Sequence, residues 1–344
     1  MKADSTNGNG SLTAKDFATD QDVRWCPGCG DYSILKQVQS VMAETGLPRE
    51  KVVFLSGIGC AARFPYYMDT YGMHSIHGRA PAFALGLKSV NSDLSIWIAT
   101  GDGDCLSIGG NHIIHLLRRN PDVNVLLFNN EIYGLTKGQY SPTSPSGMIT
   151  KSTPLGSIDR PFNPLSLSLG ADGTFLARTM DRDPKHLREM LMQGHLHKGT
   201  SMIEIYQNCN VFNDGAFFTY TDKATKKQAC LFLEHDQPLI FGEENEKGII
   251  LDGYSPKVVL LNDGYSPDDL WIHDQHDRIK AGILVQFFES FSENSLPRPF
   301  GIIYQEERPC YETLLNQQIH TALLDKGSGE LDEILSGKNT WHIN

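Results

Sequence analysis

The stretch Gly101-Asp102-Gly103-Asp104 decides how this chain is expected to fold. It follows a short apolar run at residues 94–99 and precedes a helix-like segment that continues to Arg119. A second apolar run, residues 123–128, leads into Asn129-Asn130-Glu131-Ile132-Tyr133-Gly134. A strand, a glycine turn, a helix and a second strand form a βαβ crossover. The sequence therefore predicts an α/β fold with a mostly parallel sheet flanked by helices.

Asp102 and Asn130 are far apart in the chain but are predicted to lie side by side. Each follows a predicted strand, and ligands bind parallel sheets outside the carboxyl ends of the strands. A carboxylate and an amide oxygen suit a magnesium ion that carries a diphosphate, and the neighbouring glycines let the backbone approach closely. An ordinary turn with a capping Asp is the alternative for Gly-Asp-Gly alone. The paired asparagines after the next strand favour the cofactor site.

Length and composition exclude several classes of protein. The chain has 344 residues, of which 40% are hydrophobic and 21% charged, as expected of a soluble globular protein with one large or two smaller domains. A net charge of −11 argues against a general nucleic-acid binder. No apolar run reaches the ~18 residues of a membrane helix. Residues 1–10 lack an apolar signal segment, so a cytoplasmic protein is expected.

The motif Cys26-Pro27-Gly28-Cys29 has three possible explanations. A thioredoxin-type redox pair should follow a strand, and the residues before Cys26 are not strand-like. A structural zinc site would need two more ligands. An iron–sulfur cluster would need four thiolates in all.

The other cysteines separate into two groups. Cys60 and Cys209 follow predicted strands, at the same edge of the sheet as the aspartate and asparagine motifs. The sequence gives less reason to expect metal binding by the other three cysteines, Cys105, Cys230 and Cys310. They are expected to be small buried residues, with Cys230 in a helix. Seven cysteines in a chain too large to need disulfides point to metal binding or catalysis.

Five motifs occur in a characteristic order. They are Cys-Pro-Gly-Cys-Gly-Asp at 26–31, Gly-Ile-Gly-Cys at 57–60, His-Ser-Ile-His-Gly-Arg at 74–79, Gly-Asp-Gly-Asp at 101–104 and Asn-Asn-Glu-Ile-Tyr-Gly-Leu-Thr-Lys-Gly-Gln at 129–139. In this order they resemble the β subunit of 2-oxoacid:ferredoxin oxidoreductases, most closely the 2-oxoglutarate branch. The resemblance implies a thiamine-diphosphate-binding fold. It suggests three parts: an N-terminal arm (1–24), a thiamine-diphosphate-binding domain with an iron–sulfur site (25–214), and a C-terminal extension packing on that domain or a partner subunit (215–344).

The resemblance also implies roles for individual residues. Asp102, Asn130 and the backbone carbonyl of Ile132 would bind Mg²⁺. Four cysteines would hold one [4Fe–4S] cluster: Cys26, Cys29, Cys60 and Cys209. The expected contacts to thiamine diphosphate are Ile58, Gly59, Cys60, Ala61, His77, Gly101, Gly103, Asp104, Gly134, Leu135 and Thr136. Arg63 and Lys137 are candidates for binding the distal carboxylate of 2-oxoglutarate.

The implied reaction is the coenzyme A-dependent oxidative decarboxylation of 2-oxoglutarate to succinyl-coenzyme A and CO₂. Electrons would leave through the cluster to ferredoxin. No Glu in this chain matches the pattern of the residue that activates the coenzyme, so it is expected from an α subunit in an αβ or α₂β₂ enzyme. The interaction partners would then be the α subunit and ferredoxin, with no nucleic acid and no membrane.

Three alternatives remain open at this point. A β subunit for pyruvate or a broad range of 2-oxoacids would share all these motifs. A thiamine-diphosphate decarboxylase or synthase without a redox cluster leaves the four cysteines unexplained. An iron–sulfur electron carrier leaves Asp102 and Asn130 unexplained.

Overall fold

The computed structural model describes residues 12–288, 292, 295–337 and 340–341. Its centre is an eight-stranded sheet with the order β2-β1-β3-β4-β8-β7-β13-β9. The strands are β1 (Val52–Ser56), β2 (Tyr71–His74), β3 (Ser95–Gly101), β4 (Val123–Asn129), β7 (Phe175–Met180), β8 (Thr200–Tyr206), β9 (Cys230–Phe232) and β13 (Arg298–Gln305). Every neighbouring pair is parallel except β13 with β7. The predicted mostly parallel sheet is confirmed.

The side chains along each central strand point alternately into two hydrophobic cores, one on each face of the sheet. In β1, Val53 and Leu55 pack into one core while Val52 and Phe54 pack into the other. Successive side chains of a strand point to opposite faces, so a strand covered on both sides needs an almost continuous apolar sequence. This requirement explains why short apolar runs marked the strands.

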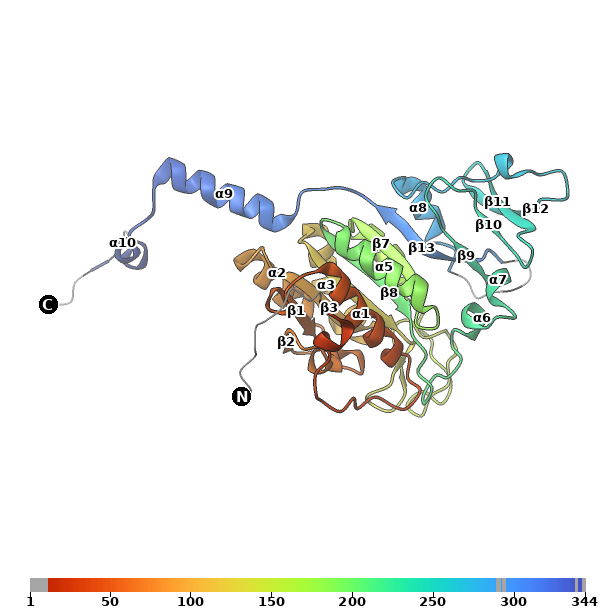
Figure 1. Ribbon diagram of the computed structural model, residues 1–344, viewed down its shortest axis with the longest axis horizontal. Coiled ribbons are helices and arrows are strands. Elements are labelled where there is room, and N and C mark those ends of the chain that lie inside the picture. The colour runs from red at the N-terminus through yellow and green to blue at the C-terminus, as the bar shows by residue number, and fades with distance from the viewer. Residues whose placement is uncertain (1–11, 289–291, 293–294, 338–339, 342–344) are drawn as a thin grey trace.

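Helices cover both faces of the sheet (Figure 1). On one face α1 (Asp31–Thr45) and α5 (Pro184–Leu196) pack against each other and contribute to the same core. The helices that contribute to the other core are α2 (Ala80–Val90), α3 (Gly110–Arg119), α4 (Pro164–Gly170) and α8 (Arg278–Leu284). The two layers of helices leave the carboxyl ends of the central strands accessible to a ligand.

The register brings the predicted functional turns to one edge. β3 pairs with β4 with Gly101 opposite Phe128, and β4 pairs with β8 with Asn129 opposite Tyr206. The turns that follow these strands therefore emerge together, as predicted for Asp102 and the asparagine motif. A π-helical turn (Asp104–Ile108) and α3 complete the predicted crossover between β3 and β4.

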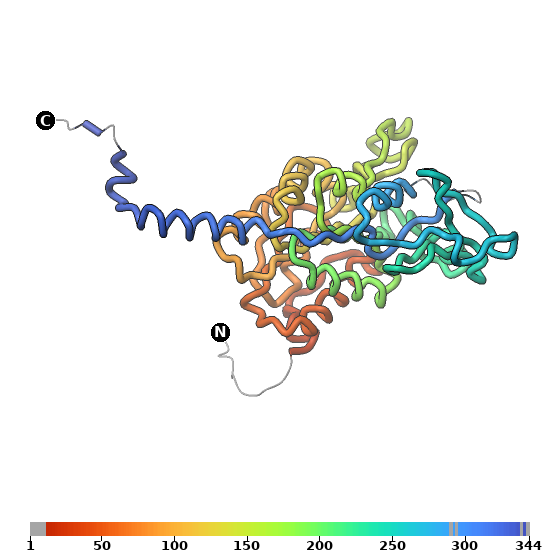
Figure 2. Tube along the Cα trace, turned by 90° about the horizontal axis from the view of Figure 1, so that it is seen from above, coloured from red at the N-terminus to blue at the C-terminus, as the bar shows by residue number. Residues whose placement is uncertain are grey.

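The C-terminal part of the chain has three components. β9 and β13 extend the main sheet, whereas β10 (Ile240–Phe241), β11 (Lys247–Asp252) and β12 (Ser255–Leu260) form a small antiparallel sheet. Helices α9 (Tyr311–Lys326) and α10 (Leu331–Ser336) lead away from the body as an arm (Figures 1 and 2). The short elements between the main strands are β5 (Ile132–Tyr133), β6 (Gln139–Tyr140), α6 (Phe218–Thr221) and α7 (Lys226–Ala229). The division at residue 214 stays a prediction.

The structure corrects one prediction about the cysteines. Cys230 begins β9, which pairs with β13, because α7 ends one residue earlier; the helix predicted for it is wrong. The burial of Cys105, Cys230 and Cys310 is confirmed. In the part of the chain that the structure describes, no helix has the length and apolar character needed to cross a membrane.

Candidate coenzyme and cluster site

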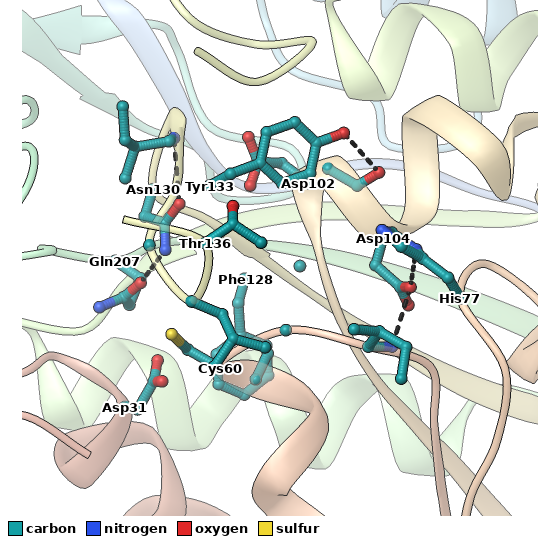
Figure 3. Close-up of a pocket in the computed structure, with 18 residues that line it drawn as sticks. Asp31, Cys60, His77, Asp102, Asp104, Phe128, Asn130, Tyr133, Thr136 and Gln207 are labelled. Atoms are coloured by element: carbon teal, nitrogen blue, oxygen red, sulfur yellow. Dashed lines mark hydrogen bonds and ion pairs between the residues drawn. The ribbon is translucent and has the colours of Figure 1, made fainter. Parts of the chain in front are cut away.

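One pocket at the carboxyl edge of the sheet collects all the predicted coenzyme contacts and magnesium ligands (Figure 3). Its open volume, including space continuous with solvent, is about 550 Å³. The predicted residues that line it are Ile58, Gly59, Cys60, Ala61, His77, Gly101, Asp102, Gly103, Asp104, Asn130, Ile132, Gly134, Leu135 and Thr136. Four residues that the motifs did not identify also line it: Asp31, Phe128, Tyr133 and Gln207.

Asp102 lies in this pocket as a buried carboxylate, only 2% exposed. Its Oδ2 accepts hydrogen bonds from Ser141 Oγ and Thr143 Oγ1, each at 2.5 Å. Burial raises the pKa of Asp102 to about 6, although the two hydroxyls partly oppose this shift. A cation would favour the charged form of this carboxylate, so the residue fits the role of a Mg²⁺ ligand.

The Asn130 side chain, after the carboxyl end of the neighbouring strand β4, has a defined orientation. Its Oδ1 accepts a hydrogen bond from the Ile132 N–H at 3.1 Å, and its Nδ2 donates to Gln207 Oε1 at 2.8 Å. A backbone N–H can only donate, so the amide oxygen must face Ile132. The Oδ1 atom keeps a second lone pair, which suits it to a hard cation such as Mg²⁺.

A buried ion pair in the sheet orients Asn129, which lies next to the predicted metal ligand Asn130 in the chain. Arg178 Nε donates to Glu204 Oε2 at 2.8 Å, and Glu204 Oε1 accepts from Asn129 Nδ2 at 2.8 Å. A carboxylate can only accept, so Asn129 must turn its Oδ1 toward Thr143, whose hydroxyl lies 2.9 Å away and also contacts Asp102. The ion pair is fully buried. The hydrogen bonds through Asn129 and Thr143 connect it to the predicted metal ligand Asp102.

Asp104 joins three turns at the wall of the pocket. It accepts hydrogen bonds from the N–H groups of Ile58 at 3.0 Å and Gly78 at 2.8 Å, and from Thr100 Oγ1 at 2.8 Å. Its Oδ1 also lies 2.6 Å from His77 Nδ1. Asp104 therefore positions Ile58 and His77, two predicted coenzyme contacts.

A side chain at position 103 is expected to weaken coenzyme binding measurably. A Cβ atom on Gly103 would lie 2.1 Å from Cε1 of Tyr133, a residue that lines the pocket and whose hydroxyl donates to Gly103 O at 3.2 Å. Gly103→Ala must displace this ring, and we expect thiamine diphosphate to bind about tenfold to 100-fold more weakly by calorimetry with Mg²⁺ present. Gly110→Ala is the control, because its Cβ would meet no neighbouring atom within 4 Å. Equal affinities in the two variants would contradict this placement of the coenzyme.

A second pocket adjoins the first and contains the four cysteines predicted to bind iron. Cys26, Cys29, Cys60 and Cys209 line it, together with both candidate substrate-binding residues: Arg63 and Lys137. Five residues line both pockets: Cys60, Asn130, Gly134, Leu135 and Gln207. The remaining residues around the second pocket are Arg24, Trp25, Asn210 and Phe212.

The loops that carry the cysteines are joined by hydrogen bonds. Trp25 Nε1 donates to the Cys60 carbonyl at 2.8 Å. Asn210 Nδ2 donates to the Pro27 carbonyl at 2.7 Å, and the Gly30 N–H donates to the Asn208 carbonyl at 3.1 Å. These contacts connect the Cys26–Cys29 loop to the turns that carry the other two thiols.

The arrangement of the four thiols around the second pocket is compatible with a cluster. Among the described residues, no three His, Cys, Asp or Glu side chains are close enough to hold one metal ion. A structural zinc would need all its thiolates on one atom, whereas the thiolates of an iron–sulfur cluster bind separate irons. Burial raises the pKa of the Cys60 thiol to about 12, with further increases from Asp31 and from the other cysteines. The Cys60 thiol therefore needs a cationic centre beside it to ionise, which the iron of a cluster would supply.

The sequence contained only weak signals for the residues that were missed. Asp31 and Gln207 lie within or beside the cysteine motifs, but nothing in those motifs shows that their side chains reach the pocket. Ser141 and Thr143 lie in the segment 133–145, whose Gly, Thr, Ser and Pro content and position after the asparagine motif predict a loop that folds over the diphosphate. Nothing in this pattern shows that the two hydroxyls contact Asp102. Only the fold brings their hydroxyls onto Asp102.

Comparisons with known proteins agree with this geometry. Residues 57–205 match the family model described as thiamine pyrophosphate enzyme, C-terminal TPP binding domain. The chain is 46% identical over 333 residues to 2-oxoglutarate oxidoreductase subunit KorB of Mycobacterium tuberculosis, covering 96% of this chain and 88% of that protein. It is also 43% identical over 205 residues to the 2-oxoacid:ferredoxin oxidoreductase subunit beta of Saccharolobus solfataricus, covering 59% and 67% of the two chains. The chain belongs to the 2-oxoacid:ferredoxin oxidoreductase β-subunit family.

A solved structure gives the same result for the fold of this oxidoreductase β subunit. It is the 2-oxoglutarate:ferredoxin oxidoreductase from Magnetococcus marinus with 2-oxoglutarate, coenzyme A and succinyl-CoA bound. The two chains are 30% identical, superpose with a TM-score of 0.76, and cover 96% and 97% of each other. The similarity therefore extends over nearly the whole β subunit.

Proposed function

We propose that this chain is the β subunit of a 2-oxoglutarate:ferredoxin oxidoreductase and carries both the coenzyme and the cluster. The observation that carries the proposal is the shared wall between the two pockets, which contains Cys60, Gly134 and Gln207. The reaction is 2-oxoglutarate plus coenzyme A plus oxidised ferredoxin giving succinyl-coenzyme A, CO₂ and reduced ferredoxin, and it is reversible. Electrons can reach an iron–sulfur centre directly only if it lies next to the coenzyme.

The residues of the first pocket bind and orient. In this proposal Asp102, Asn130 and the Ile132 carbonyl hold Mg²⁺ and through it the diphosphate. Ser141 and Thr143 keep Asp102 in place. Bound thiamine diphosphate supplies an electron sink for decarboxylation.

The residues of the second pocket bind the electron acceptor. Cys26, Cys29, Cys60 and Cys209 are proposed to hold a [4Fe–4S] cluster. Gly134 lies against this pocket, since a Cβ there would be 3.5 Å from Cys60 Sγ and 3.6 Å from Cys209 Sγ. A side chain at this position would enter the space between the coenzyme and the two sulfurs.

The β subunit is predicted to be inactive by itself. Among the described residues that line the coenzyme pocket there are three aspartates and no glutamate, so the activating Glu is assigned to an α subunit in an αβ or α₂β₂ enzyme. We expect no turnover of 2-oxoglutarate with a dye acceptor for the purified chain, and turnover after co-expression with its α subunit. Decarboxylation by the purified β subunit alone would contradict this.

We assign recognition of the substrate's distal carboxylate to a positively charged side chain in the second pocket. The names of the relatives from Mycobacterium tuberculosis and Magnetococcus marinus specify 2-oxoglutarate, which supports this substrate over pyruvate. The distal carboxylate of 2-oxoglutarate would then pair with Arg63 or Lys137, which line this pocket. Arg63 is already oriented, because its Nε donates to Tyr67 Oη at 3.1 Å.

Arg63→Ala tests this assignment. We expect the KM for 2-oxoglutarate to rise about tenfold to 100-fold, because a hydrogen bond between charged groups is lost. The KM for 2-oxobutyrate, which lacks the distal carboxylate, should change little. Lys137→Ala, assayed in parallel, tests the second candidate. Equal changes for both substrates in the Arg63 variant would remove that residue from the distal site.

A further inference from the structure

We propose that Gln207 couples the magnesium site to the cluster site, because it orients Asn130 and also donates a hydrogen bond to Cys29. This inference deepens the proposed function and rests on it. Gln207 is 1% exposed and lines both pockets. Its contact with Asn130 is visible in Figure 3. No recognised motif identifies this residue as functional.

The backbone holds Gln207 beside the asparagine turn. β8 ends at Tyr206, and the N–H of Gln207 donates to the Asn129 carbonyl at 2.9 Å. This bond extends the pairing of β8 with β4 by one step beyond the last strand residue. The side chain of Gln207 therefore starts from a position that the parallel sheet defines.

The orientation of the Gln207 amide follows from its acceptor partner. Its Nε2 lies 2.6 Å from the Asn208 carbonyl, which can only accept, so this atom must be the NH₂ group. The Oε1 atom then faces Asn130 Nδ2 at 2.8 Å. Asn130 is fixed independently by the Ile132 N–H on its Oδ1. The two amides thus have compatible orientations that are set from both ends.

The second N–H of Gln207 reaches the cluster site. Nε2 lies 3.3 Å from Cys29 Sγ, within hydrogen-bond distance for sulfur. Hydrogen bonds to the sulfur ligands help set the reduction potential of an iron–sulfur cluster. A donor stabilises the additional negative charge of the reduced state, so this contact should raise the potential.

One side chain therefore acts on both cofactor sites. The Oε1 atom of Gln207 accepts from Asn130 Nδ2, so the Oδ1 atom of Asn130 points away from Gln207. The Nε2 atom of Gln207 contacts Cys29, a proposed cluster ligand. Partners that orient a metal ligand are worth about tenfold to 100-fold in metal affinity or activity. Gln207 is thus a positioning residue for Mg²⁺ and a determinant of the cluster potential.

The test uses the anaerobically purified complex of this chain with its α subunit. The wild-type complex is measured first for bound thiamine diphosphate and for the spectrum of an iron–sulfur cluster. Absence of either would refute the proposed function itself, before any variant is considered. Two quantities are then compared among variants: the Mg²⁺ dependence of thiamine diphosphate binding, and the midpoint potential in a redox titration followed by electron paramagnetic resonance.

Gln207→Met removes both polar contacts at similar volume. We expect Mg²⁺ to bind about tenfold more weakly and the midpoint potential to become more negative. Gln207→Glu keeps an oxygen toward Asn130, and as an ionised carboxylate it has no hydrogen-bond donor toward Cys29. Its potential should also become more negative, with Mg²⁺ affinity close to wild type. Gln193→Met on the exposed side of α5 is the control and should change neither quantity.

A Gln207→Met complex in which only one quantity changes, or neither, overturns the coupling. Circular dichroism establishes whether that variant is folded. If it does not fold or assemble, Gln207→Glu decides. An unchanged midpoint potential in Gln207→Glu overturns the proposal, and a more negative one with retained Mg²⁺ affinity supports it.

Discussion

Asp102→Ala is expected to abolish the reduction of ferredoxin by 2-oxoglutarate, with kcat/KM lower by about a thousandfold or more. The substitution removes the carboxylate assigned to Mg²⁺, and without the ion the diphosphate loses the cation that would neutralise its charge. Steady-state assays of the complex give the rate. Thermal unfolding gives an independent measurement, because a ligand that binds only the folded state raises the midpoint temperature. Mg²⁺ with thiamine diphosphate should stabilise the wild-type complex and leave the variant unchanged.

Loss of function in this variant should not reflect loss of the fold. The pKa of Asp102 is raised to about 6 in the folded chain, above its usual value, because the charged form is buried. An acid whose pKa is higher in the folded than in the unfolded chain loses stabilising free energy as the pH rises from the unfolded to the folded value, so ionised Asp102 does not stabilise the metal-free chain at neutral pH. The variant should therefore unfold near the temperature of the metal-free wild type. Asp93→Ala, at an exposed surface ion pair, is the control.

Cys209→Ala has the second largest expected effect. The variant complex should lose the visible absorbance of the cluster and most of its iron and acid-labile sulfide, because one of four thiolate ligands is missing. Ferredoxin reduction should fall to background, while thiamine diphosphate still binds in the presence of Mg²⁺. Iron and sulfide analysis, absorption spectroscopy and calorimetry measure these three properties.

Cys230→Ala is the matched control for this substitution. Cys230 is buried, whereas Cys209 is partly exposed. The Cys230 Sγ donates to the Tyr220 carbonyl at 3.3 Å, and this residue does not line the second pocket. This variant should keep the cluster. Retention of the cluster in Cys209→Ala, or zinc in place of iron in the wild-type complex, would refute the assignment of the four cysteines.

The sequence by itself was sufficient to predict the parallel sheet and the position of both pockets. Strands covered on both faces need continuous apolar runs, so residues 94–99 and 123–128 could be recognised without a structure. The parallel crossover then required the turns after them to meet at one edge. Family motifs supplied the residue-level assignments, and every assigned coenzyme contact lies in the first pocket. The local sequence pattern gave the wrong secondary structure at Cys230, because pairing with β13 makes this residue part of a strand.

Only the tertiary structure decided which side chains support the predicted ligands. Thr143 contacts Asp102, Glu204 orients Asn129, and Gln207 joins Asn130 to Cys29. The partners in each of these contacts are dozens of residues apart in the chain. A hydrogen bond depends on distance and direction, and both are set by strand register and by the path of the intervening loops. A sequence pattern can therefore identify the ligands, whereas the groups that orient them become apparent only when the sheet is assembled.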